Sequence, residues 1–545
     1  MADQSIKSSS DNTPQIDNGD LEAVRESLVQ SIDSLLNTNE APSLDAQISS
    51  MRCCLSESER EVLAIEAEIQ RTRQYLEQLE AKRQGIHDYI AKQKLVLNPA
   101  RRIPSEVLYQ IFKEYHITPN DWWANPTFCD SLSVRSMHWV LSRVCSQWRT
   151  VAFSLASALW SQLHVKLPTG LDGPTMLLGA HIQHSRSNPL SVFIKGAFPS
   201  SAPKRHPILT TLFQNAYRLE ELRMSMRIDD IQEAFSFFKP LIPSLRILVI
   251  NHSTSIQRDG TLTDSSNPWV VDSFQSAPQL CSVALIHIYL PHRVLLPWNN
   301  LVRLRLVVAG GFWRISHLFG ILRSTGNLQH LMVGYHFAHE PELAVSSIIT
   351  LPSLKTWSIW WITQNTSDQD IHQGGNQLLE NLVLPRLQKF YDSISRHGSM
   401  DFSRISSLIE RSGSLVKTLS CMISETDELL LSSSIGRIGN NLTYLRLKKV
   451  GGNFTEAIVV ALTCRTNSEV HLAPRLTELH LHGGMEFNAT SFMVMVESRK
   501  SENGVAPLSH VALDCMGQRA PENLEAFDRF EGDDCFKGVK WSFKL

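Results

Sequence analysis

The sequence predicts an α/β protein in which a long N-terminal helix and a small all-α unit precede a C-terminal solenoid with a mostly parallel, curved sheet. Three patterns support this fold: an apolar heptad repeat over 44–97, two amphipathic helical patterns over 98–165, and a recurring leucine pattern over 216–545. Residues 1–43 are expected to form a disordered tail with one short helix, and 166–215 a transition segment.

The heptad repeat predicts a coiled-coil helix. Eleven of the fifteen positions in its two seam rows are apolar, while many acidic and basic residues lie outside the seam. Such a helix either pairs with a second copy of the chain or folds back onto its own domain, and Arg83 and Gly85 weaken the pairing pattern. The apolar seam residues are Leu44, Ile48, Met51, Leu55, Val62, Ile65, Ile69, Leu76, Leu79, Ile86 and Ile90.

Two amphipathic helices are predicted after the coiled coil. Pro104 suits the start of a helix, and Glu106 in the first turn complements the helix dipole. A short Ser/Ala-rich run and a Leu-Trp pair follow the second helix, and a Trp of this size normally closes a small helical cluster. The apolar residues of the two helices are Val107, Leu108, Ile111, Phe112 and Tyr115, then Val140, Leu141, Val144, Cys145, Trp148, Val151 and Ala152.

The order of these residues resembles the F-box, the segment by which substrate receptors of cullin-type ubiquitin ligases bind their Skp adaptor. Ile103 stands where the family usually has leucine, and an insertion over 116–136 separates the two helices. The alternative is a small helical unit that caps the next domain. The resemblance implies an adaptor-binding surface made or supported by Pro104, Glu106, Leu108, Ile111, Phe112, Val144, Trp148 and Trp160.

A pattern Leu-x-x-Leu-x-Leu recurs eleven times at intervals of 21 to 35 residues, which resembles irregular leucine-rich repeats. Each copy predicts a short strand with alternate residues in the core and a return segment leading to the next, parallel strand. Ordinary α/β structure with similar strands is the alternative. The copies begin at Leu219, Leu245, Leu280, Leu301, Leu328, Leu354, Leu387, Leu415, Leu442, Leu476 and Leu508.

The residues between the core leucines are expected on the concave face of the solenoid, where a protein substrate would bind. Arg, Tyr and Trp there are the types that supply binding hot spots, although a solvated face without a ligand would carry charges too. The favoured positions are Arg303, Arg305, Trp360, Tyr444, Arg446, His480 and His482; Glu221, Arg223, His330, Lys389, Lys448 and Glu478 share the face.

Composition and motifs exclude several classes of function. The net charge of −2 gives no indication of a nucleic acid partner, and no apolar stretch is long enough to cross a membrane. The nine cysteines contain no CxxC pair, which predicts reduced thiols in the cytoplasm or nucleus. His480-x-His482 lacks a third ligand in the sequence, so we expect no metal site, and no cofactor or catalytic motif is present.

These observations lead to one functional hypothesis and one rival. The resemblance implies a non-catalytic, substrate-recruiting subunit of a Skp–cullin–F-box ubiquitin ligase, with Skp and, through it, a cullin as partners. The repeats would bind an unknown protein substrate, and residues 44–97 would pair two copies. The rival is a leucine-rich-repeat scaffold that associates through its coiled coil.

Overall fold

The computed structural model describes residues 29–38, 45–114, 130–167, 172–197, 206–238, 240–252, 269–288, 290–338, 348–361, 375–394, 402–423, 425–464, 471–499, 505–515 and 540–544. Most of the expected tail, residues 1–28 and 39–43, and most of the expected insertion, residues 116–129, therefore lie outside the described residues. The chain divides into two compact units, Met1–Ile103 and Pro104–Leu545.

The first unit contains the predicted long helix. Helix α2 runs over Asp45–Leu97, and residues 29–38 before it are also helical. A 3₁₀ turn, η1, follows at Pro99–Arg102, where the Asn98 side chain accepts a hydrogen bond from the Ala100 N–H. Among the described residues, no helix combines the length and apolar composition that crossing a bilayer requires.

Five short helical segments open the second unit. They are α3 (Ser105–Glu114), α4 (Met137–Arg143), α5 (Ser146–Thr150), a π-helical turn η2 (Val151–Leu155) and a 3₁₀ turn η3 (Ser157–Trp160). The second amphipathic pattern, predicted as one helix, is broken because Cys145 is extended, with φ of −160° and ψ of 176°.

A large parallel sheet forms the rest of this unit, as predicted. Within the described residues fourteen strands pair in the order β1-β2-β3-β4-β5-β6-β7-β9-β11-β12-β13-β14-β15-β16, and every pairing is parallel. Their bounds are Gln162–Lys166, Leu190–Lys195, Leu219–Met226, Ile247–His252, Ser282–Ile286, Arg303–Arg314, His330–Ala338, Thr356–Trp361, Lys389–Ile394, Thr418–Met422, Tyr444–Phe454, Glu478–Met485, His510–Asp514 and Lys540–Lys544. Strands β8 (Ile349–Thr350) and β10 (Leu382–Val383) form a separate parallel pair.

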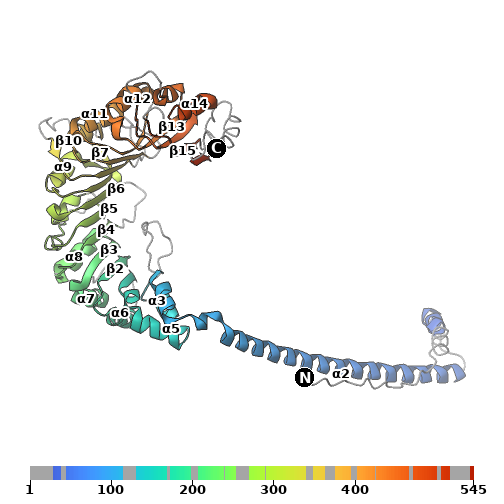
Figure 1. Cartoon of the computed structure of the whole chain (residues 1–545). Helices are drawn as coiled ribbons and strands as arrows, with labels where there is room; N and C mark the ends of the chain where they lie inside the picture. The colour runs from blue at the N-terminus through green and yellow to red at the C-terminus, as the bar shows by residue number, and fades with distance from the viewer. Residues whose placement is uncertain are drawn as a thin grey trace. The chain divides into compact units, whose positions relative to one another are not determined.

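The strands follow one another along an arc, with the helices on its outer side (Figure 1). Two consecutive parallel strands need a connecting segment that brings the chain back to the end of the sheet where the first strand began, and these helices lie in such segments. The apolar strand residues pack against them. These helices are α6 (Asp172–His184), α7 (Pro207–Gln214), α8 (Ile228–Phe238), α9 (Ile315–Arg323), α11 (Phe402–Ser412), α12 (Glu425–Ile438), α13 (Glu456–Leu462) and α14 (Ala489–Ser498).

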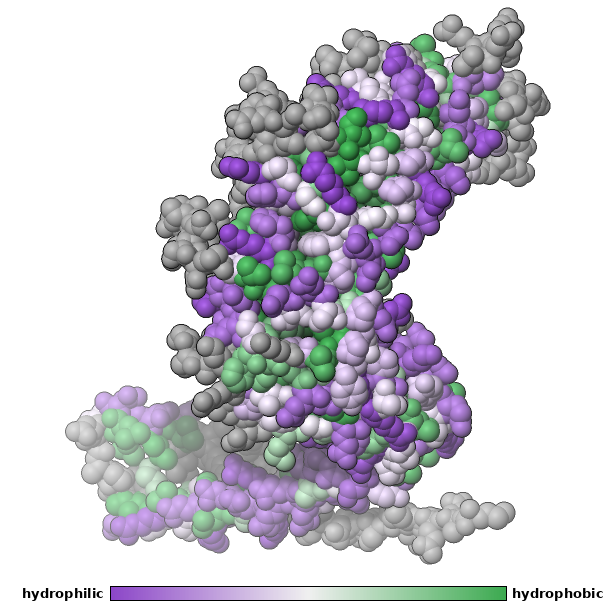
Figure 2. Space-filling view, turned by 90° about the vertical axis from the view of Figure 1, so that its left-hand side faces the viewer, coloured by the Kyte–Doolittle hydropathy of each residue, from purple (hydrophilic) through white to green (hydrophobic). Residues whose placement is uncertain are grey.

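On the outer side, the described residues form several separate apolar patches. Figure 2 looks onto this side and shows small green patches between purple ones. Exposed apolar side chains here include Met176 of α6, Val460 of α13 and Val494 of α14. Isolated residues of this kind are normal on a globular surface. An exposed apolar residue on the outer side, such as Val494, is therefore a suitable position for a control substitution.

A continuous ladder of backbone hydrogen bonds joins the repeats just before each strand. From β4 onward, one carbonyl per repeat accepts N–H groups from the next repeat; the Val302 carbonyl, for example, accepts from Gln329 at 2.9 Å and His330 at 3.0 Å. The ladder passes through Arg246, Cys281, Val302, Gln329, Lys355, Gln388, Lys417, Thr443, Thr477, Ser509 and Lys540. Each repeat is thus tied to its two neighbours, as in a solenoid.

One predicted copy of the repeat is shifted by one residue. The sequence pattern places Leu415, Thr418 and Ser420 in the core, but Leu415 is 63 % exposed. The buried residues are instead Val416 and Leu419, because Leu419 pairs with the buried Phe390 of β11. A shift of one residue exchanges the two faces of a strand, and here it brings the apolar side chains inward.

The sheet also begins earlier than the expected start at residue 216. Strands β1 and β2 fall before it, within the expected small unit and the transition segment, and pair in register from Gln162–Ser191 to Lys166–Lys195. Val165, Val192 and Ile194 are buried in the same apolar core as the later repeats. These strands lack the Leu-x-x-Leu-x-Leu spacing, so the repeat pattern alone did not reveal them.

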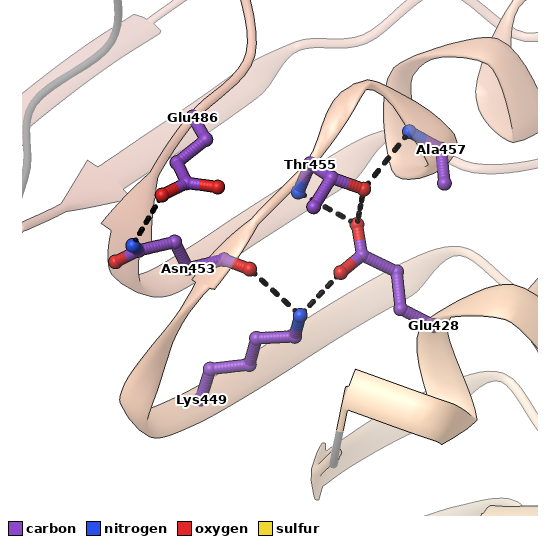
Figure 3. A network of polar contacts seen from close by, with 6 residues as sticks. All are labelled: Glu428, Lys449, Asn453, Thr455, Ala457 and Glu486. Carbon is purple, nitrogen blue, oxygen red and sulfur yellow. Dashed lines mark hydrogen bonds and ion pairs between the residues drawn. The ribbon is translucent and has the colours of Figure 1, made fainter.

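A buried ion pair stabilises the region where β13 becomes irregular (Figure 3). The Lys449 ammonium contacts the Glu428 carboxylate of α12 and donates to the Asn453 carbonyl at 2.8 Å. Glu428 also accepts from the Thr455 backbone N–H at 2.8 Å. Leaving one partner of such a pair uncompensated typically costs about 3–5 kcal/mol. On the neighbouring strand β14, Gly483 has a φ of 146°, and a Cβ at this position would lie only 2.8 Å from the Lys449 carbonyl oxygen. A residue with a side chain would therefore not fit here.

Candidate functional site

The small helical unit has a compact core that includes three of the eight predicted adaptor-binding residues. Leu108 and Trp160 are 0 % exposed and Phe112 is 1 % exposed. The Phe112 ring meets Trp148 edge-on at 5.4 Å between centroids, and the Trp160 indole N–H donates to the Ala152 carbonyl at 2.8 Å. Leu108, Phe112 and Trp160 therefore hold the unit together rather than form its surface, and the partly buried Trp148 packs against this core.

The other predicted residues lie on the surface of the same unit. Ile111 is 47 % exposed and Val144 is 52 % exposed, and Pro104 and Glu106 are exposed as well. Val107 and Val140, which the amphipathic pattern assigns to the same helices, are also more than 40 % exposed. The apolar residues of α3 thus divide between the core of the unit and its surface.

This unit packs directly against the first repeat of the solenoid. The Ser131 backbone N–H donates to the His164 carbonyl of β1 at 2.8 Å, and the Ser131 hydroxyl accepts from the His164 N–H at 3.0 Å. The Trp160 ring lies 5.0 Å from Trp139 and 4.8 Å from His181 of α6. Helical unit and sheet consequently share one packed junction.

His181 is the most buried titratable group of that junction. Its side chain is 0 % exposed, and its Nε2 lies 3.2 Å from the Ser131 carbonyl, which fixes Nε2 as the donor. Burial away from water lowers the pKa of His181 to about 4, against the opposing effect of backbone hydrogen bonds. The imidazole is therefore neutral in the folded protein at neutral pH.

The predicted partner-binding residues lie on the inner sheet face in two groups. In the first group, the Arg305 guanidinium of β6 lies 5.7 Å from the Trp360 ring centroid of β9, across β7. Trp360 is 40 % exposed, and Arg303 precedes Arg305 by two residues on the same face. An exposed Trp beside arginines is a composition that protein interfaces favour.

The second group lies on β13 and β14. The Tyr444 and His480 rings are 4.9 Å apart, and Arg446 is in register with His480. His482 does not join them, because its Nδ1 is 2.9 Å from the Asp514 carboxylate of β15. Burial, followed by the charges of His510 and Arg446, lowers the pKa of His480. His480 and His482 therefore have separate partners, Tyr444 and Asp514.

Two residues that the site prediction omitted also lie beside His480. Glu478 was assigned to the inner face but not to the site, and His510 on β15 was not considered. The two are in register across β14 and β15. Aligning the copies that begin at Leu476 and Leu508 would have placed them opposite each other, since each lies two residues after its first leucine.

No protein-family model matches this chain, and no curated protein matches it. The fold by itself defines an α/β protein with a long N-terminal helix and a large, repeat-built parallel sheet.

Proposed function

We propose that this protein is a substrate-recruiting F-box subunit of a Skp–cullin–F-box ubiquitin ligase. The observation that carries the proposal is the division of the F-box-like residues between a packed core and an exposed apolar surface. Leu108, Phe112 and Trp160 are buried, whereas Ile111 and Val144 remain about half exposed. A small helical unit that leaves apolar side chains in water gains stability when a partner covers them.

The sheet supports the second half of the proposal. Its inner face has Arg305 packed over the exposed Trp360, and Tyr444 and Arg446 lie further along the same face. The substrate receptor would bind the adaptor through α3 to α5 and the substrate through these strands. Ubiquitin transfer would be performed by other subunits, and this chain would contribute no catalytic residue.

The adaptor half is tested by a pull-down of the full-length protein with a Skp adaptor. Asp substitutions at Ile111 and Val144 place charges on the proposed contact surface without entering the core. We expect wild type to bind and Ile111→Asp with Val144→Asp to lose at least about tenfold in affinity. Substitution of Leu108 would be uninformative because this residue is 0 % exposed and its replacement by Asp would disrupt the unit itself.

A matched control is available on the outer side of the solenoid. Val494→Asp changes a valine that is 54 % exposed, compared with 52 % for Val144. This variant should bind the adaptor as wild type does. If folded wild-type protein does not bind a Skp adaptor, the ligase proposal is wrong.

The rival proposal, a repeat scaffold that associates through α2, is supported by the exposed seam of that helix. Leu55, Val62 and Leu76 are each more than 50 % exposed. A scaffold of this kind would self-associate but would not bind the adaptor. The two proposals therefore make opposite predictions for the same pull-down.

A further inference from the structure

Two histidines and one glutamate gather at the C-terminal end of the inner sheet face. Glu478 and His480 are two residues apart on β14 and so share a face, and His510 on β15 is in register with Glu478. Each side chain can offer one ligand atom, and the three atoms lie within 4.8 Å of one another. The parallel register thus places a second imidazole, His510, beside Glu478 and His480.

The distances between the three side chains suit an ion better than they suit hydrogen bonds. Glu478 Oε2 is 3.9 Å from His480 Nε2 and 3.9 Å from His510 Nδ1. Both separations exceed the usual range of a hydrogen bond. Ligand atoms around a tetrahedral zinc ion are roughly 3.3 Å apart, given bonds of about 2.0–2.1 Å. Small rotations of all three side chains, the 43 % exposed Glu478 among them, would bring the ligand atoms to this spacing.

His480 offers an unused ring nitrogen to an ion. Within the described residues, its Nε2 is buried and has no hydrogen-bond partner. An unsatisfied buried polar atom is costly, and a metal bond to His480 Nε2 would remove that cost.

The surrounding charges set the expected affinity. Arg446 is in register with His480, and Lys540 is in register with His510, so two cationic residues flank the cluster. The Glu478 carboxylate faces both rings and offsets part of this repulsion. Tyr444 packs against His480 at 4.9 Å and covers one side of the ring. We therefore expect an affinity in the micromolar range, weaker than that of a closed structural site.

We infer that Glu478, His480 and His510 bind a zinc ion on the inner face of the solenoid. Two imidazoles and one carboxylate form a three-ligand set that zinc accepts in sites that keep a fourth position open. His482 is not a ligand, because it is held by Asp514. The fourth position would face the inner side of the arc, and this inference does not depend on the ligase proposal.

The experiment is a zinc titration of the full-length protein, using zinc chloride and a competing chromophoric chelator. Wild type should bind one zinc ion per chain with a Kd of about 1–10 μM. His510→Ala and Glu478→Gln should each weaken binding at least about tenfold, since each removes one of three ligands. The matched control is His482→Ala, on the same strand and face, which should leave the affinity unchanged.

Two further measurements distinguish this site from zinc binding elsewhere in the chain and from loss of folding. The adjacent thiols Cys53 and Cys54 on α2 could also bind zinc, so Cys53→Ser with Cys54→Ser should retain the wild-type affinity. Circular dichroism should show all variants folded. The inference is overturned if wild type binds no zinc at about 100 μM, if binding survives in folded His510→Ala, or if it disappears with the two cysteines.

Discussion

Helix α2 and the solenoid both contain apolar residues at regular intervals, but only the solenoid buries them. The first leucines of successive repeats, such as Leu301, Leu354 and Leu442, are 0 % exposed. Seam residues in the middle of α2 are exposed, with Ile69 at 45 % and Leu76 at 56 %, whereas Ile48 and Met51 near its start are partly buried. Periodicity alone therefore does not determine burial, and the difference depends on what covers each row.

In the solenoid the cover comes from the same chain. Each repeat packs its leucines against the next, and the backbone ladder before the strands holds neighbouring repeats together. The heptad repeat of α2 places its apolar residues in a row along one side of a single helix, so no other part of that helix can cover them. We therefore expect a second copy of α2 to cover the row.

The largest effect should come from a solenoid leucine. Leu445→Ala on β13 removes a side chain that is 0 % exposed and should lower the free energy of unfolding by about 2–5 kcal/mol. Leu76→Ala on α2 should change the same unfolding transition by less than about 0.5 kcal/mol. Urea unfolding followed by circular dichroism measures both. Equal costs would mean that α2 is buried within its own chain.

The second prediction concerns the His181 side chain, which is buried within its own chain. His181 has a folded pKa of about 4 against 6.5 when unfolded, so the unfolded chain binds the proton more readily between these values. Stability should be complete above about pH 6.5 and fall by about 3 kcal/mol as the pH drops toward about 4. Urea unfolding measures this change: the free energy of unfolding should be lower at about pH 5 than at about pH 7.5.

Two variants assign that decline to His181. His181→Gln keeps an N–H donor that can bond to the Ser131 carbonyl, but it cannot be protonated, so it should make the decline with falling pH smaller than in wild type. His87→Gln alters an exposed ring on α2 and should leave the pH profile as in wild type. An unchanged profile in His181→Gln would show that another group causes the decline.

The smallest effect is expected in self-association. Ile69→Asp with Leu76→Asp puts charges into the seam of α2 and should weaken association at least about tenfold, or about 1.4 kcal/mol. Leu63→Asp is the control, because Leu63 is 63 % exposed but lies outside the seam. Light scattering should report a dimer for wild type and Leu63→Asp and a monomer for the seam variant. A monomeric wild type would contradict pairing through α2.

Most of the fold follows from sequence periodicity, and the departures have physical causes. The repeat spacing predicted eleven strands, although the copy at Leu415 needed the paired strand residue Phe390 to fix its register. Strands β1 and β2 escaped detection because Val165 and Val192 occupy core positions without leucine spacing. The break at Cys145 arises from its extended backbone, which an amphipathic pattern does not encode.

The candidate sites were predictable only in part, since a site depends on contacts between strands. Residue type and alternation placed Arg305 and Trp360 on one face, but their contact depends on pairing across β7. Likewise, His480 was identified, while its neighbours Glu478 and His510 required the register of β14 with β15. The F-box pattern did not separate the buried Leu108 from the exposed Ile111, because both fall on apolar positions of one helix.

The Ser131–His164 contacts have a practical consequence for dividing the protein into parts. An outermost strand offers unpaired N–H and C=O groups to which another chain can add, which leads to aggregation. At β1 the Ser131 backbone and hydroxyl occupy the His164 groups that would otherwise be open. A truncated protein beginning at Gln162 would lose this protection and should precipitate, whereas one beginning at Pro104 would retain it.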